Sequence, residues 1–464
     1  MLIAIGGVAV VRITTHRLGP SDYGTFALIV TFVTLFTIAA DLGITAATSI
    51  ELSKPESDHS SILSSALSSR IAVSLALIPV IQASAFILYP HETVLFRAAL
   101  AMMSLDVLFT TLQITFATEF IARVRGDRIA VLNMINRALY VFGVIVVAIN
   151  RGTYFDYICA YVGADFVSAL MYAVAVRRVI PLRWNSNLAQ WRQMATVALP
   201  LGTIQIIATI YLWIDSIMVS LICSRTQLGL YSLAFNALVV VLAVPNFLMQ
   251  ALIPSLVAAT REVAEFLINR TCYLAYCIGA LVAVCGVVLR QDAVLAIGGP
   301  KFILASTPFA IIFLTVPLTS LQMVFAYAGI SLDKYRPMIP LGMCGLGLNI
   351  AINAILIPKY GPSGAAVALL ISESVSLVAT YLMFRRLTGI STNLWRLWRP
   401  TVAALAAFLF MNFARSFWEP LSPIIGVCVG GALVVVVYLF FLMAVGGLPR
   451  GVRQRLLGRE QTRV

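Results

Sequence analysis

The feature that most constrains this chain is a succession of apolar stretches, each roughly twenty residues long, separated by short polar segments. A helix needs roughly 20 apolar residues to cross the hydrocarbon core of a bilayer. Charged residues make up 11% of the chain, whereas a soluble domain carries roughly 25%. The sequence therefore predicts an all-α integral membrane protein.

About fourteen stretches are long and apolar enough to be predicted as transmembrane helices. They are residues 1–15, 23–47, 63–88, 94–118, 130–149, 155–176, 194–222, 229–257, 268–289, 303–329, 338–357, 361–384, 399–417 and 421–446. The first is short for a span, because about fifteen helical residues reach only ~22 Å of a core ~30 Å thick. Met1 is followed at once by apolar residues, so no signal peptide is expected.

The basic residues predict an orientation. With the N-terminus placed inside, about 23 of the 32 Lys and Arg residues fall on the inner side and about nine on the outer side. Such a bias predicts that both termini are cytoplasmic. The net charge of +13 is then mostly a topology signal, and nucleic acid is not an expected partner.

A short motif occurs twice. Residues 21–28 and 226–233 share the pattern polar, x, x, Gly, x, aromatic, small, Leu, 205 positions apart, and a long apolar run follows each copy. This repetition predicts that the chain contains two copies of one helical bundle. The expected parts are an N-terminal six-helix lobe (1–176), a cytoplasmic linker (177–193), a second six-helix lobe (194–386), and two extra helices with a basic cytoplasmic tail (387–464). Trp184 and Trp191 in the linker are expected at the headgroup level.

Four motifs, in order along the chain, resemble a known transporter family. They are Arg17-Leu18-Gly19-Pro20-x-x-Tyr23-Gly24, Asp41-Leu42-Gly43, Gly229-Leu230-Tyr231-Ser232, and the run from Ile357 to Ala366. Together they resemble the bacterial polysaccharide biosynthesis transporters, the Wzx-type oligosaccharidyl-lipid flippases of the multidrug/oligosaccharidyl-lipid/polysaccharide (MOP) exporter superfamily.

The resemblance implies two six-helix lobes that face each other across a central cavity and work by alternating access. The implied substrate is an oligosaccharide repeat unit of O-antigen (lipopolysaccharide), capsule or exopolysaccharide on an undecaprenyl diphosphate carrier. The implied location is the bacterial cytoplasmic (inner) membrane. A polysaccharide polymerase and the export machinery are the expected protein partners.

Polar side chains inside the spans predict the lining of such a cavity, because an ionisable group facing lipid costs roughly 2.5–3.5 kcal/mol at a helix centre. Helical spacing places them in stripes. The predicted substrate-binding residues are Arg12, Arg70, Arg137, Asn133, Tyr140, Tyr161, Tyr172, Gln113 and Tyr211. The arginines would bind the diphosphate through paired charge-assisted hydrogen bonds, and the tyrosines and amides would contact sugar hydroxyls.

The acidic residues inside the spans predict ion coupling. Asp106, Asp165, Asp215 and Glu373 are expected to take up a proton or a sodium ion. The alternative is that these polar groups form helix-to-helix contacts that only set the packing. Asp41 lies near the inner end of its helix and is predicted to form a structural ion pair with Arg123 or Arg125 at the cytoplasmic gate.

Three other functions compete with this hypothesis. A peptidoglycan lipid-precursor flippase would share the fold, and a drug or cation antiporter should have an acidic cavity, which Arg12 and Arg137 disfavour. A membrane polysaccharide polymerase or ligase should hold its chemistry in a sizeable outer loop, whereas the outer loops here are about fifteen residues or shorter.

The remaining residues do not predict catalysis, metal binding or nucleotide binding. The three histidines lie far apart, the seven cysteines show no CxxC spacing, and there is no GxxxxGK[ST] phosphate loop. The cysteines are expected to be small apolar packing residues. The prediction is therefore a transporter with no catalytic residue, metal site or cofactor, driven by a proton or sodium gradient or by the membrane potential.

Overall fold

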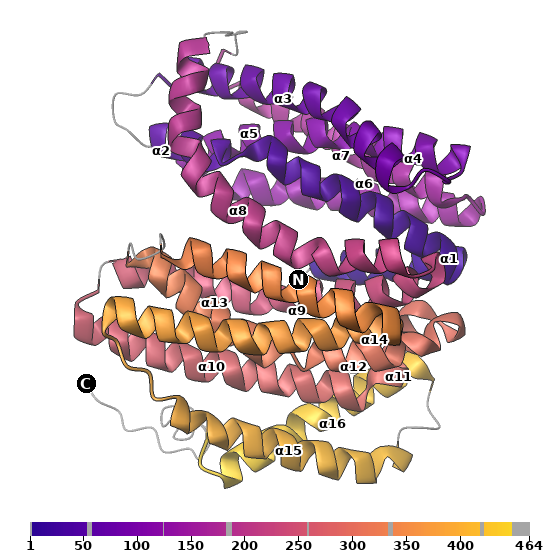
Figure 1. Cartoon of the computed structure of the whole chain (residues 1–464), viewed down its shortest axis with the longest axis vertical. Helices are drawn as coiled ribbons and strands as arrows, with labels where there is room; N and C mark the ends of the chain where they lie inside the picture. The colour runs from indigo at the N-terminus through magenta and orange to yellow at the C-terminus, as the bar shows by residue number, and fades with distance from the viewer. Residues whose placement is uncertain are drawn as a thin grey trace. The chain divides into compact units, whose positions relative to one another are not determined.

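The computed structural model describes residues 2–52, 58–123, 125–181, 188–257, 259–332, 337–417 and 422–447, and their regular elements are helices throughout (Figure 1). The first are α1 (Leu2–Asp41), α2 (Ile44–Leu52), α3 (His59–Leu88), α4 (Val94–Ser104), α5 (Asp106–Ala122), α6 (Gly126–Ile149), α7 (Tyr154–Arg177), α8 (Leu188–Ile222) and α9 (Arg225–Val257). Next come α10 (Arg261–Val288), α11 (Arg290–Gly298), η1 (Pro300–Ala305), α12 (Ser306–Phe313), α13 (Val316–Ser331), α14 (Met338–Thr388), η2 (Leu394–Leu397), α15 (Trp398–Phe413), η3 (Ala414–Phe417) and α16 (Pro423–Ala444). The all-α prediction is confirmed.

Among these described residues, ten helices are long and apolar enough to cross a membrane, or eleven if the pair Pro300–Phe313 and Val316–Ser331, bent by 40°, is one span. The predicted number of about fourteen is not confirmed by this criterion. The difference lies in α15, which has 16 residues, and in α1 and α14, which have 40 and 51 residues and are each interrupted by one non-helical residue.

The interruptions of α1 and α14 are glycines. Gly19 has φ 72° and Gly361 has φ 55°, values that glycine adopts without a steric penalty. Both are followed by proline, which has no backbone N–H to continue a helix. An unbroken helix of α14's length would span ~76 Å, more than twice the thickness of a bilayer core. The predicted span boundaries at 15–23 and 357–361 fall at or beside these two glycines.

Contacts divide the chain into two compact units, Met1–Leu233 with Leu346–Ala365 and Ala234–Gly345 with Ala366–Val464. In the first unit α1 packs against α3 to α8, α5 packs against α3 and α7, and α6 packs against α7. In the second, α10 packs against α13 and α15, and α15 packs against α16. The lobe limits predicted at residues 176, 194 and 386 come from the sequence repeat and differ from the limits of these compact units. The two-lobe division stays a prediction. Residues 182–187, with Trp184, and 448–464 lie outside the described residues.

Short polar segments begin the helices at predictable places. Asp58 caps α3 by accepting hydrogen bonds from the N–H groups of Ser60 and Ser61, and Thr93 caps α4 by accepting from Phe96. Thr153 and Asp156 form a capping box at the start of α7. Such caps satisfy N–H groups that the helix itself leaves without partners.

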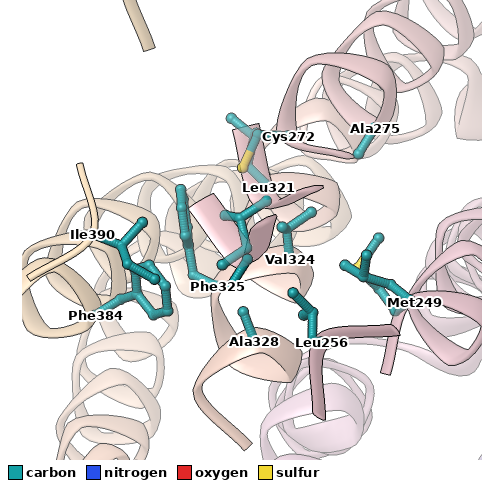
Figure 2. Packing of buried hydrophobic residues seen from close by; sticks show 13 residues of the cluster. Met249, Leu256, Cys272, Ala275, Leu321, Val324, Phe325, Ala328, Phe384 and Ile390 are labelled. Atoms are coloured by element: carbon teal, nitrogen blue, oxygen red, sulfur yellow. The ribbon is translucent and has the colours of Figure 1, made fainter. Parts of the chain in front are cut away.

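The apolar core of the second unit is built from α9, α10, α13 and α14. Figure 2 shows Leu321, Val324 and Phe325 of α13 between Met249 and Leu256 of α9 and Phe384 of α14, with Cys272 of α10 in the same cluster. All seven cysteines are free of disulfides, and Cys272 and Cys277 are buried among apolar side chains. The expected packing role is therefore confirmed for these two.

Candidate functional site

Two of the predicted ion-coupling carboxylates meet inside the first unit. Asp106 is the first residue of α5 and is 4% exposed, and Thr110 donates a hydrogen bond to its Oδ2 at 3.1 Å. Asp165 lies on α7, and its carboxyl lies close to that of Asp106. Two adjacent carboxylates repel each other unless a proton or another cation lies between them. Such a pair can hold a proton or another small cation.

Two amide side chains donate hydrogen bonds to Asp165 of this carboxylate pair. Asn136 of α6 donates to Asp165 Oδ1 at 2.7 Å. Gln113 of α5 donates to the Asp165 main-chain oxygen at 3.0 Å and accepts from Ser168 Oγ at 3.0 Å. Three helices thus contribute oxygen and N–H groups to one partly buried site, and displacement of any one helix would change the hydrogen bonds of the others.

A cation and two aromatic rings adjoin the pair. The Arg137 guanidinium lies 5.7 Å from the centre of the Tyr140 ring, and Tyr140 meets Tyr161 edge to face at 5.1 Å. Arg137 also lies against α1, where a Cβ on Gly7 would stand 2.6 Å from its Nη2. Its Nε is buried and has no hydrogen-bond partner among the described residues.

Six of the predicted site residues thus lie close together, and Asn136 lies with them. We call these seven residues the first-half network. It consists of Asp106, Gln113, Asn136, Arg137, Tyr140, Tyr161 and Asp165.

A second buried carboxylate, Asp215 of α8, is fully enclosed. Asn353 of α14 donates to its Oδ1, and the Tyr231 hydroxyl donates to its Oδ2 at 3.2 Å. Asn353 also donates to Asn349 Oδ1 at 3.0 Å. Sequence reasoning missed both asparagines, although their i, i+4 spacing inside an apolar stretch was a usable signal.

Glu373 of α14 lies in the second unit, is 4% exposed, and accepts from Thr319 Oγ1 of α13 at 2.9 Å. Glu373 and Ser168 are 205 positions apart, as are the two copies of the sequence motif. Ser168 of α7 donates to Gln113 of α5, and Glu373 of α14 accepts from Thr319 of α13. Each half of the sequence thus uses this position for a hydrogen bond to another helix.

The other predicted ligands lie outside the first-half network. Tyr172 donates to Asn133 Oδ1 at 3.0 Å, which joins α7 to α6. Arg12 lines a cavity between α1 and α6, and Tyr211 is half-buried on α8.

Arg70 differs from its predicted role as a diphosphate ligand. It is 1% exposed, forms an ion pair with Asp41, and donates to Thr115 Oγ1 at 2.6 Å. A guanidinium enclosed with its counter-charge is a structural element of the bundle. Asp41 thus forms its ion pair with Arg70 of α3, so the predicted pairing with Arg123 or Arg125 is corrected.

The predicted gate arginines have other surroundings. Arg123 forms an ion pair with Glu119, which is fully buried and also contacts His59 Nδ1 at 2.9 Å. Arg125 is exposed. The prediction rested on the cytoplasmic side that these groups were expected to share, whereas the packing of α3 against α1 brings Arg70 to Asp41.

The two copies of the repeated motif touch each other. A Cβ on Gly24 of α1 would stand 2.0 Å from the carbonyl oxygen of Arg225, and one on Gly229 of α9 would stand 2.0 Å from that of Pro20. The helices therefore cross with their backbones in direct contact. Beside this crossing Arg225 forms an ion pair with Glu92.

Comparison with known proteins agrees with this architecture. The model of a protein family described as "Polysaccharide biosynthesis protein" matches residues 2–259, more than half of the chain. The chain belongs to this family. The resemblance read from the four motifs is confirmed at this level.

Two curated relatives are each 23% identical to this chain. One is the capsular polysaccharide biosynthesis protein CapF of Staphylococcus aureus, matched over 45% of this chain and 54% of the relative. The other is named "Probable flippase AglR", from Haloferax volcanii, matched over 54% of each chain. The chain thus spans about half the length of the curated relatives it matches.

Solved structures establish the fold. The lipid II flippase MurJ, in an inward closed conformation, matches 98% of both chains with a TM-score of 0.80 at 13% identity. An inward-facing multidrug resistance MATE family transporter of the MOP superfamily matches 83% of this chain and 94% of its own with a TM-score of 0.71 at 12% identity. The chain is therefore a multi-pass membrane protein with the fold of these transporters.

Proposed function

We propose that the protein is a flippase that moves undecaprenyl-diphosphate-linked oligosaccharide repeat units across the cytoplasmic membrane by alternating access. Its family and its fold both support this function. The observation that carries the proposal is the first-half network, in which a carboxylate pair and an arginine lie on membrane-spanning helices, with Asp106 buried and Asp165 and Arg137 partly buried. Such groups are costly in a bilayer and commonly mark ion or substrate pathways.

In this proposal the Asp106 and Asp165 pair couples transport to an ion. Two adjacent carboxylates repel each other unless a proton or cation lies between them. Loss of that ion would push Asp165 from Asp106 and disturb its bond to Asn136, so that α5, α6 and α7 would shift together. A proton or sodium gradient, or the membrane potential, would supply the energy, with Asp215 and Glu373 as further candidate ion sites.

Arg137 is the proposed diphosphate ligand. Its guanidinium lies against the Tyr140 ring and the Gly7 surface, and its Nε has no hydrogen-bond partner among the described residues, so its N–H groups suit phosphate oxygens. Arg12 is proposed as a second phosphate contact, and Asn133, Tyr172 and Tyr211 as contacts to sugar hydroxyls.

The same proposal places the protein in the bacterial inner membrane with both termini in the cytoplasm. It includes cooperation with a polymerase and the export machinery, and it needs no cofactor or catalytic residue.

The test is complementation of a deletion strain with Arg137→Ala. We expect surface polysaccharide to fall by about tenfold or more, since a lost charge-assisted contact is worth about 1.5–3 kcal/mol. The lipid-linked repeat unit should accumulate, measured by mass spectrometry of lipid extracts.

Arg128→Ala is the matched control, because Arg128 lies on the same helix, 5.8 Å from the Phe120 ring centre, yet outside the network. Equal polymer levels in both variants would remove Arg137 from the site. Loss of cell-wall precursor transport instead would identify a peptidoglycan flippase, and loss of dye efflux would identify a drug antiporter.

A further inference from the structure

A cavity of about 310 Å³ lies between α1 and α6 in the first unit. From α1 it is lined by Arg12, Ile13, His16 and Arg17, and from α6 by Ile145, Ala148 and Ile149. None of these lining residues is acidic. One wall is therefore cationic and the other is apolar.

The apolar wall is exposed. Ile149 is 71% exposed and Ile145 is 40% exposed, and they lie on one face of α6 with Ala148 between them in sequence. Of the ten candidate spans, α6 has the smallest buried share, 11%. Exposed isoleucines on a spanning helix indicate contact with hydrocarbon rather than with water.

The cationic wall stands at the end of the apolar run. Arg17 is two residues before the Gly19-Pro20 elbow, and Ile149 is the last residue of α6. The cavity therefore lies where hydrocarbon gives way to headgroups, and the charge bias of the loops places this interface on the outer side. Arginine and histidine at this depth suit a phosphate group whose acyl chain lies in the bilayer.

We propose that this cavity binds the phosphate headgroup of an anionic phospholipid, with the lipid's acyl chain along Ile145 and Ile149. Its volume is at the lower end of the ~300–1,000 Å³ typical of small-molecule sites, which suits a headgroup and leaves no room for an oligosaccharide. The site contains no residue of the first-half network, and Arg12 is the one residue that it shares with the proposed diphosphate contacts. It does not depend on the proposed function, because a bilayer lipid can occupy it in any transporter cycle.

The experiment is native mass spectrometry of the purified full chain in detergent, titrated with phosphatidylglycerol or with zwitterionic phosphatidylcholine. We expect the protein to retain one phosphatidylglycerol in preference to phosphatidylcholine. Arg17→Gln should weaken that binding by about threefold to fivefold, as expected for a partly exposed charge pair. Arg17→Lys, which keeps the charge, should retain most of the affinity.

Arg151→Gln is the matched control, because Arg151 is exposed in the loop just after α6 and does not line the cavity. It should leave phosphatidylglycerol binding unchanged. Equal retention of both lipids, or equal loss of binding in Arg17→Gln and Arg151→Gln, would overturn the proposal. Displacement of phosphatidylglycerol by inorganic phosphate alone would show a free-anion site and would overturn it too, as would preferential displacement by a polyprenyl phosphate, which would assign the cavity to the carrier lipid.

Discussion

The contact between the two copies of the repeated motif leads to a sharp prediction about stability. In Gly24→Ala, the new Cβ would lie 2.0 Å from the carbonyl oxygen of Arg225. That oxygen belongs to the backbone and cannot rotate away. Because contacts under 3.0 Å essentially never occur, α1 and the start of α9 must separate locally by at least about 1 Å.

The magnitude follows from two opposing terms. Overpacking a close contact costs about 1–3 kcal/mol, whereas glycine to alanine in a helix interior otherwise stabilises by about 1 kcal/mol. The matched control is Gly347→Ala, because Gly347 lies in α14 of the same unit with open space where its Cβ would be. Both variants gain the same helix term, so we expect the unfolding free energy of Gly24→Ala to lie about 1–3 kcal/mol below that of Gly347→Ala.

The assay is denaturant unfolding of the purified variants in detergent micelles, followed by tryptophan fluorescence. The double variant Gly24→Ala/Gly229→Ala should cost less than the sum of the two single changes, because one separation of the helices relieves both clashes. Strict additivity, or a Gly24→Ala variant as stable as Gly347→Ala, would refute the reciprocal backbone contact.

Two further predictions concern buried charges. Asp41→Asn should destabilise the protein by about 3–5 kcal/mol in the same unfolding assay, because it leaves the Arg70 guanidinium, 1% exposed, without its counter-charge. Glu92→Gln removes the ion pair with Arg225, whose side chain is 22% exposed, and should cost about 1 kcal/mol or less. Similar costs for both variants would contradict the burial argument. Asp165→Asn should make transport in proteoliposomes insensitive to the proton or sodium gradient, since it removes one of the paired carboxylates. Asp156→Asn, which changes only the capping box of the same helix, should keep the gradient response, and a normal response in Asp165→Asn would return that residue to a packing role.

Much of the candidate site was predictable because periodicity alone assigns residues to helix faces. Asp106, Gln113 and Asp165 were expected to line a polar interior, and they meet in the first-half network. The repeated Gly24 and Gly229 motif was also visible as a pattern. What the pattern could not reveal is that its two copies lie against each other, because residues 205 positions apart carry no local signal of contact.

The amino-acid sequence by itself determined that this chain is a helical membrane protein, since apolar stretches of span length have no stable alternative in water. It also determined where the helices bend, because Gly19-Pro20 and Gly361-Pro362 cannot continue a regular helix. Only the tertiary structure decided the partners: Arg70 for Asp41, Asp165 for Asp106, and Asn353 for Asp215. The rotation and packing of whole helices bring such pairs together, and many residues far apart in sequence set that packing at once.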